Sequence, residues 1–217
     1  MAVDWIRADW PAPASVVAGT TLRSRDGKAL PVAGTPCWLQ QVHGSRVVAA
    51  SAYDDMPEAD ASVSGDEGYI CVVRTADCLP VLLCSRDGLS FAAAHAGWRG
   101  LAAGVLENTV ATLGVAGSEL LAWLGPAISQ PSFEVGGEVR AAFVDHDAQA
   151  AMFFEPNARG RWQADLYGLA RQRLASVGVN DTYGGGLCTV ADEKRFFSYR
   201  RDADSGRMLS FIATASP

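Results

Sequence analysis

The chain has 217 residues, 49% of them hydrophobic, so it is long enough to bury a sizeable core. Its formal net charge of −6 argues against a protein that binds nucleic acid by neutralising phosphates. It has no run of about 18 apolar residues and its first residues lack the features of a signal peptide, so we expect no membrane partner and a cytoplasmic location.

The N-terminal part of the chain predicts short strands and turns. Residues 1–36 are rich in proline and glycine and leave room only for strands at 15–18 and 20–23. Residues 35–50 predict two short strands joined at His43-Gly44, where the glycine permits a tight turn and a close approach to whatever His43 binds. Residues 51–67 predict a polar, turn-like connection.

Three apolar runs follow, at 68–74, 79–85 and 90–94. Continuous runs of this length, bounded by turns, are typical of central strands that are covered on both faces. Cys78 and His95 therefore fall at strand ends, where α/β proteins gather their sites because the sheet holds the residues rigidly.

The rest of the chain alternates helical and extended patterns. Helices are predicted for 101–113, 137–147 and 164–177, and strands for 120–124, 184–190, 195–199 and 208–213. No repeat, low-complexity tract or long linker divides the chain, so residues 1–217 are predicted to form a single domain.

Three residues are candidate metal ligands: His43, Cys78 and His95. Two imidazoles and one thiolate, with a fourth position left for water or substrate, are typical of a catalytic zinc site. The spacing alone is weak support, because three separate loops must converge; the alternatives are two hydrogen-bonded histidines and a packed cysteine. The five cysteines are odd in number and form no CxxC pair, so disulfides and a structural zinc site are not expected.

Several segments of the chain resemble one known family. WLQQVHG, ADASVS, TADCLPVLLC, AAAHAGWRG, LGPAISQPSFEVGGEVR, ADLYGLARQRLASVGV and RFFSYRRDADSGRM follow one another between about Trp38 and Ile212, as in the YfiH or PgeF-like family. This family is also called the laccase-domain or polyphenol-oxidase family.

The resemblance implies a fold, a cofactor and an activity. The fold is a mixed-sheet, multilayer α/β sandwich, and the cofactor is zinc held by His43, Cys78 and His95. The activity is phosphorolysis of adenosine, inosine and methylthioadenosine, with adenosine deamination as a second activity. Some bacterial members are linked to correcting peptidoglycan precursors, and the older label of copper polyphenol oxidase also belongs to the family.

The sequence departs from the family pattern near its start. Members usually carry a segment with Asn-Leu-Gly and a helix ending in Asn-Arg before the WLQQVHG-like strand. Here Thr20-Thr21-Leu22-Arg23 is followed almost at once by Pro36-Cys37-Trp38. We therefore expect that helix and its arginine to be missing.

Other residues near the three ligands are candidates for substrate binding and catalysis. Arg46 and Arg99 are candidates for a phosphate clamp, because guanidinium groups bind oxyanions bidentately; the alternative is a surface salt bridge. Asp77 is a candidate proton donor to the leaving base or a partner that supports a ligand, or it is a turn-forming residue. Gln41 either contacts a purine edge or pairs with the backbone.

A basic and aromatic cluster near the C-terminus leaves two interpretations open. It either forms a wall that binds a nucleotide or sugar phosphate, or it buries Phe197 and Tyr199 and points its arginines to solvent. Its members are Lys194, Arg195, Phe196, Phe197, Tyr199, Arg200, Arg201 and Arg207. His146 is predicted to be exposed and uninvolved.

Rival functions remain at this stage. A multicopper oxidase needs more imidazoles than three histidines supply, although copper could replace zinc at the same three ligands. Cys78 could instead be a nucleophile activated by His95, in a hydrolase suited to peptidoglycan precursor editing. A third alternative is a module that binds a nucleoside without turnover, and the sequence does not indicate the oligomeric state.

Overall fold

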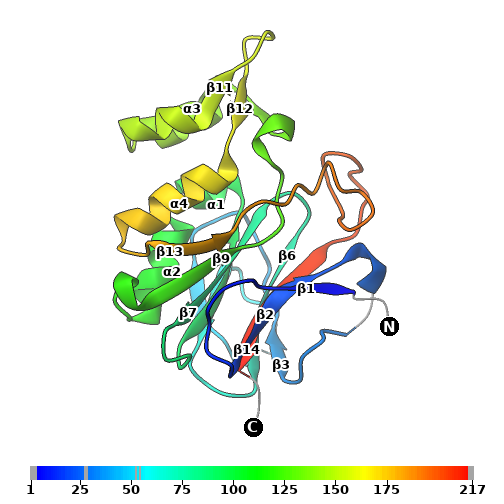
Figure 1. Ribbon diagram of the computed structural model, residues 1–217, viewed down its shortest axis with the longest axis vertical. Helices are drawn as coiled ribbons and strands as arrows, with labels where there is room; N and C mark the ends of the chain where they lie inside the picture. Colours follow the sequence, from blue (N-terminus) through cyan, green and yellow to red (C-terminus); the bar gives the residue numbers. More distant parts are fainter. Residues whose placement is uncertain (1–3, 27–28, 52, 54, 215–217) are drawn as a thin grey trace.

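The structure is a computed structural model that describes residues 4–26, 29–51, 53 and 55–214. Its core consists of two stacked sheets with helices on the outer face of one of them (Figure 1). The five-stranded sheet has the order β1-β2-β14-β6-β3, and the six-stranded sheet has the order β13-β9-β7-β8-β5-β4. The predicted mixed α/β sandwich is therefore confirmed.

The strands of the five-stranded sheet are β1 (Trp5–Arg7), β2 (Val16–Thr21), β3 (Thr35–Cys37), β6 (Tyr69–Thr75) and β14 (Met208–Thr214). Those of the six-stranded sheet are β4 (Val47–Ala49), β5 (Ala61–Ser64), β7 (Leu79–Ser85), β8 (Phe91–Ala96), β9 (Leu120–Leu124) and β13 (Asp181–Gly184). The first sheet pairs β3 with β6 in parallel, and the second pairs β4 with β5 and β13 with β9 in parallel; the other pairs are antiparallel.

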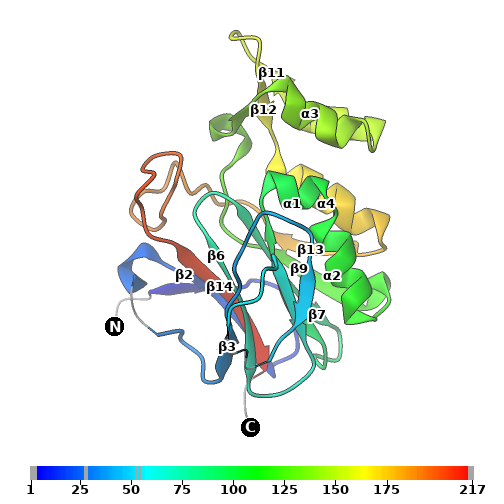
Figure 2. The same ribbon diagram turned by 180° about the vertical axis from the view of Figure 1, so that it is seen from behind.

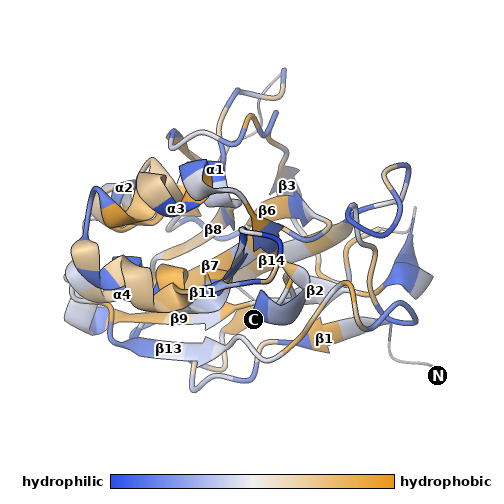
Figure 3. Ribbon diagram, turned by 90° about the horizontal axis from the view of Figure 1, so that it is seen from above, coloured by the Kyte–Doolittle hydropathy of each residue, from blue (hydrophilic) through white to orange (hydrophobic). Residues whose placement is uncertain are grey.

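Strand β7 shows why the central strands are apolar on both faces. Leu82 and Cys84 belong to the core between the two sheets, whereas Val81 and Leu83 pack into the core beneath the helices. Successive side chains of a strand point to opposite faces, so a strand with both faces covered needs an unbroken apolar run. In Figure 3 the central strand β7 has the colour of hydrophobic residues, whereas the edge strand β13 is largely hydrophilic.

The helices are α1 (Trp98–Ala102), α2 (Val105–Leu113), α3 (Gly137–Val144) and α4 (Leu166–Ser176), and short 3₁₀ turns occur at η1 (Arg23–Arg25), η2 (Gly117–Glu119), η3 (Gln130–Ser132) and η4 (Ala148–Phe153). Helices α1, α2 and α4 lie over the six-stranded sheet (Figure 2). Within the described part of the chain the longest helix has 11 residues, and none is long and apolar enough to cross a membrane.

Four element predictions are wrong. The helix expected at 101–113 is two helices, because Gly104 adopts a left-handed conformation (φ 90°) between α1 and α2. The strand expected at 184–190 is absent apart from Gly184, the last residue of β13, and residues 195–199 form turns and irregular backbone rather than a strand. The supposedly polar connection at 51–67 contains β5, which is buried between β4 and β8.

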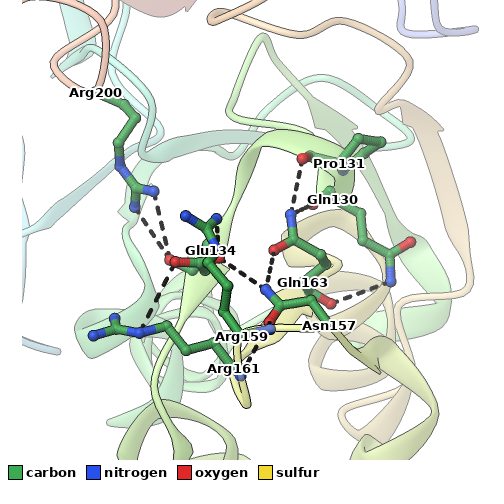
Figure 4. A network of polar contacts seen from close by, with 8 residues as sticks. All are labelled: Gln130, Pro131, Glu134, Asn157, Arg159, Arg161, Gln163 and Arg200. Atoms are coloured by element: carbon green, nitrogen blue, oxygen red, sulfur yellow. Dashed lines mark hydrogen bonds and ion pairs between the residues drawn. The ribbon is translucent and has the colours of Figure 1, made fainter.

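A third sheet was not predicted at all. It has the order β10-β12-β11, with β10 (Glu134–Val135), β11 (Phe154–Pro156) and β12 (Trp162–Ala164), and it projects with α3 beyond the two large sheets (Figure 1). Polar side chains join its strands: Asn157 donates hydrogen bonds to Glu134 and Gln163 at 2.8 and 3.1 Å (Figure 4). Strands of two or three residues are too short to give an alternating pattern.

Candidate metal centre and adjoining cavity

The structure brings His43, Cys78 and His95 together. His43 lies in the connection from β3 to β4, Cys78 immediately precedes β7, and His95 is in β8. One ligand atom from each of the three lies within 4.8 Å of the other two, and Cys78 Sγ is 3.9 Å from His43 Nε2. The ring of His43 is exposed, Cys78 is half-buried and His95 is buried, so the cluster opens on one side.

Asp60 orients two of these three residues. Its carboxylate, completely buried, lies 2.7 Å from His95 Nδ1 and accepts hydrogen bonds from the backbone N–H groups of Val42, His43 and Gly44 at 3.2, 2.9 and 2.7 Å. Because Nδ1 of His95 contacts Asp60, Nε2 is the ring nitrogen that is free to bind a metal ion. A carboxylate behind a histidine is the usual support of a metal-binding imidazole.

Two glycines of the HAGWRG segment allow the ligands to approach. A Cβ atom on Gly97 would lie 2.9 Å from Cys78 Sγ and 3.2 Å from His43 Cδ2. A Cβ atom on Gly100 would lie 2.7 Å from the carbonyl oxygen of Gly44. A side chain at position 97 would therefore push the start of α1 away from Cys78 and His43. A side chain at position 100 would push α1 away from the loop that carries His43.

The charges of the cluster suit a thiolate ligand. Burial raises the pKa of Cys78, but hydrogen bonds to His43 and His95 and the charges of both rings outweigh it and lower that pKa to about 6. Burial lowers the pKa of His95, whereas its contacts with Asp60 and Cys78 raise it to about 9. Both pKa shifts favour a thiolate at Cys78 next to a protonated His95.

These donors fit a metal ion. In a tetrahedral zinc site with bonds of about 2.0–2.3 Å, neighbouring donors lie about 3.3–3.7 Å apart. The observed separations, all within 4.8 Å, need only a small contraction to reach these values. Nitrogen and thiolate donors are those that zinc prefers, and three protein ligands leave the fourth position open.

The cluster lies in the wall of a cavity of about 630 Å³. Gln41, Asp77 and Arg99 also line it, whereas Arg46 does not appear among its lining residues. The structure therefore places one of the two arginines expected for a phosphate clamp beside the cluster and leaves the other outside the wall.

Gln41 and Asp77 are both engaged by other parts of the chain. Gln41 donates to the carbonyl of Arg74 at 2.9 Å and accepts from its N–H at 2.8 Å, which is the backbone pairing that the sequence left open. Asp77 accepts hydrogen bonds from Thr189 Oγ1, Ser198 Oγ and the N–H of Arg200, at 2.6, 3.0 and 2.6 Å. This geometry favours a supporting role for Asp77 over proton donation.

The cavity is basic and aromatic. Its wall contains Arg74, Arg99, Arg200 and Arg207 together with Trp98, Phe133 and Tyr199. No carboxylate of the described residues lies within ion-pair distance of these four arginines. A protein with a net negative charge thus gathers unpaired positive charge at one cavity, as an anion-binding site does.

The basic cluster near the C-terminus matches neither of its two interpretations fully. Tyr199, Arg200 and Arg207 line the cavity, and Tyr199 is 57% exposed. Phe196 and Phe197 are buried instead. The contributors to the site that the sequence analysis missed include Asp60, Arg74, Trp98 and Phe133. For Asp60 the available signal was a single acid among small residues in ADASVS.

Comparisons with known proteins agree with these observations. A family model described as multi-copper polyphenol oxidoreductase laccase matches residues 16–215. The chain is 48% identical over 236 aligned positions to the purine nucleoside phosphorylase PA4543 of Pseudomonas aeruginosa, covering 96% of this chain and 97% of that protein. It is 54% identical over 178 residues to the purine nucleoside phosphorylase YfiH of Escherichia coli, covering 82% of this chain and 73% of that protein.

Solved structures share the whole fold. The Neisseria meningitidis protein NMB0706 superposes with a TM-score of 0.93 at 42% identity, covering 99% of this chain and all of that one. YlmD from Geobacillus stearothermophilus superposes with a TM-score of 0.90 at 25% identity, covering 100% and 98% of the two chains.

One comparison and the structure bear on the expected departure from the family pattern near the N-terminus. The 236 positions aligned with the Pseudomonas protein outnumber the 217 residues of this chain, so that relative has residues without a counterpart here. Between β2 and β3, the described residues contain no helix longer than the 3₁₀ turn η1.

Proposed function

Because this chain belongs to the multi-copper polyphenol oxidoreductase laccase family, we propose that it is a purine nucleoside phosphorylase with a zinc ion held by His43, Cys78 and His95. The observation that carries the proposal is the opening of this three-ligand cluster into a cavity lined with unpaired arginines and aromatic rings. The relatives from Pseudomonas aeruginosa and Escherichia coli are named purine nucleoside phosphorylases, which supports the same reaction class here.

The arginines supply the phosphate site of this proposal. In phosphorolysis, a phosphate oxygen attacks C1′ of the ribose as the bond from C1′ to the purine nitrogen breaks. Arg99, Arg200 and Arg207 line the cavity and bind the phosphate oxygens, which positions the nucleophile and shields its charge. A bound zinc ion would supply Lewis acidity and a template beside them.

The aromatic residues supply the purine site. Trp98, Phe133 and Tyr199 line the same cavity, and an aromatic ring is a suitable platform for a purine. The substrates that we propose are adenosine, inosine and methylthioadenosine. Adenosine deamination in the same cavity is the second activity.

The test is incubation of purified protein with adenosine and phosphate, followed by chromatography of the products. We expect adenine and ribose 1-phosphate in equal amounts, formed only when phosphate is present, whereas inosine formed without phosphate measures deamination. His43→Ala and Cys78→Ser abolish turnover, and His146→Ala and Cys188→Ser, outside the cavity wall, retain it. Turnover by His43→Ala at the rate of the parent would contradict the proposal.

The geometry also favours one alternative. Cys78, His95 and Asp60 form a nucleophile, base and orienting acid, the arrangement of a cysteine hydrolase suited to editing a peptidoglycan precursor. Chelation separates the two functions. A chelated, metal-free protein that remains active and is inactivated by iodoacetamide would be a hydrolase, whereas a phosphorylase loses activity on chelation and regains it with zinc.

Copper polyphenol oxidation fits the ligands less well. All three histidines lie in the described residues, and only two of them contribute to the one metal-binding group found there. A type 1 copper and a three-copper cluster together need more imidazoles than this chain contains. Copper at the same three ligands remains the alternative to zinc.

A further inference from the structure

Two residues of the site have strained backbones. Of the described residues other than glycine, only His43 and Asp77 have a positive φ, 60° and 86° respectively. One is a candidate ligand, and the other directly precedes the ligand Cys78. A left-handed conformation outside glycine persists only where the surroundings impose it, and such residues gather at functional sites.

A buried carboxylate imposes each of these conformations. The loop of His43 donates three backbone hydrogen bonds to Asp60. Asp77 is held by its own side chain, which binds Thr189, Ser198 and the N–H of Arg200, while its carbonyl oxygen accepts from the N–H of Ile128 at 2.9 Å.

The contacts of Asp77 join two parts of the cavity wall. On one side, its backbone continues into Cys78, so the turn at Asp77 sets the position of the sulfur. On the other side, its carboxylate holds the N–H of Arg200, whose guanidinium lines the cavity. That guanidinium lies 5.8 Å from the Phe133 ring centre and 3.5 Å from the carbonyl oxygen of Glu134 (Figure 4).

We propose that Asp77 is a positioning residue that couples the metal ligand Cys78 to the anion-binding Arg200, so that phosphate and metal strengthen each other's binding. The inference rests on the proposed function for the identity of the anion. A metal bound to Cys78 stabilises the backbone turn at Asp77. The carboxylate of Asp77 then fixes the backbone of Arg200 through the hydrogen bond from its N–H. Because coupling is reciprocal, phosphate at Arg200 raises the affinity for the metal by the same factor.

The test measures Co²⁺ affinity with and without inorganic phosphate, from the absorption of the cobalt–thiolate bond. In the parent protein we expect phosphate to raise the affinity about fivefold or more. Asp77→Asn retains a residue that tolerates the left-handed backbone, but one amide oxygen cannot accept from all three donors. We expect it to bind Co²⁺ about tenfold more weakly and to lose the phosphate effect.

Three further variants make the result specific. Arg200→Ala keeps the N–H donated to Asp77, so it should retain Co²⁺ affinity and lose only the phosphate effect. Ser198→Ala removes one of the three hydrogen bonds that Asp77 accepts, so phosphate should raise the Co²⁺ affinity of this variant less than that of the parent. This variant tests the proposal even if Asp77→Asn does not fold. Asp202→Asn changes an exposed carboxylate of the same loop and should behave as the parent.

The inference is overturned if phosphate does not raise the Co²⁺ affinity of the parent protein. It is also overturned if phosphate raises the Co²⁺ affinity of Asp77→Asn or Ser198→Ala as much as that of the parent. It fails separately from the proposed function. Phosphorolysis without coupling contradicts only the role of Asp77, and coupling without phosphorolysis contradicts only the reaction.

Discussion

Asp60 accepts hydrogen bonds from three successive backbone N–H groups and contacts the ring of His95, so one side chain holds two metal ligands. Asp60→Asn keeps the shape but removes the charge and one acceptor oxygen. We expect metal affinity to fall about 10–100-fold, measured by competition with a chromophoric chelator. Asp145→Asn, an exposed carboxylate after α3, is the control and should bind as the parent. An unchanged affinity of Asp60→Asn would show that the ring of His95 is oriented without it.

The cysteines differ in reactivity because their pKa values differ. The two histidines lower the pKa of Cys78 to about 6, whereas burial raises those of Cys71 and Cys84 to about 12. The thiolate is the reactive form, so alkylation of Cys78 in chelated protein should rise with pH, reach half its maximal rate at about pH 6 and level off above that. Iodoacetamide at pH 7.5, followed by peptide mass spectrometry, should label Cys78 and leave Cys71 and Cys84 unlabelled. Zinc should protect Cys78, and its alkylation at equal rates with and without zinc would contradict the metal site.

Single residues differ in how far the sequence predicts them. His43, Cys78 and His95 could be proposed because histidine is rare in this chain and both His43 and His95 stand near glycine. Asp60 could not, because its role depends on residues 16 to 35 positions away that only the fold brings near it. For Asp77 the sequence left three roles open, and its three hydrogen bonds favour the supporting role.

At the scale of elements, the start of α1 determines how closely the ligands approach. Gly97 has an ordinary backbone conformation (φ −60°, ψ 155°), so Gly97→Ala adds no backbone strain. The new Cβ would lie 2.9 Å from Cys78 Sγ, which displaces the sulfur from the other ligands. We expect metal affinity to fall at least about tenfold, and the free energy of unfolding of the metal-free protein to fall by about 1–3 kcal/mol because neighbouring atoms must shift.

The control for this substitution is Gly137→Ala. Gly137 is the first residue of α3, and a Cβ atom there would meet nothing within 4 Å. It should leave metal binding unchanged. If Gly97→Ala also binds metal as the parent does, Cys78 Sγ is not a ligand in the position that the structure gives it. Measurement by titration with Co²⁺ reports the sulfur directly.

Elements were predictable where burial leaves a pattern in the sequence. Strands β6, β7, β8 and β9 are recognisable because both faces are covered and their residues are almost all apolar. The sheet of β10, β11 and β12 was not, since polar side chains join strands too short for alternation. Residues 195–199 look like a strand, but Phe196 and Phe197 are buried by a turn that Asp77, Ser198 and Arg201 stabilise.

At the scale of the whole molecule, the cluster lies where the chain passes between sheets. His43 is on the connection from β3, in the five-stranded sheet, to β4, in the six-stranded sheet. Cys78 is on the connection from β6 to β7, which also joins the two sheets. No local pattern predicts this convergence, because it follows from the order of strands in both sheets. A metal ion bound here cross-links two connections and β8.

Removing the metal should therefore lower the stability of the entire fold. A ligand at about 1,000 times its Kd stabilises the folded state by about 4 kcal/mol. For a chain of this size, 1 kcal/mol corresponds to about 2–4 °C, so chelation should lower Tm by about 8–16 °C, measured by calorimetry. His43→Ala should start at the lower Tm and respond little to chelator, while His146→Ala should respond as the parent does. Equal Tm values for chelated and zinc-loaded parent protein would mean that no ion joins the two connections in the folded state.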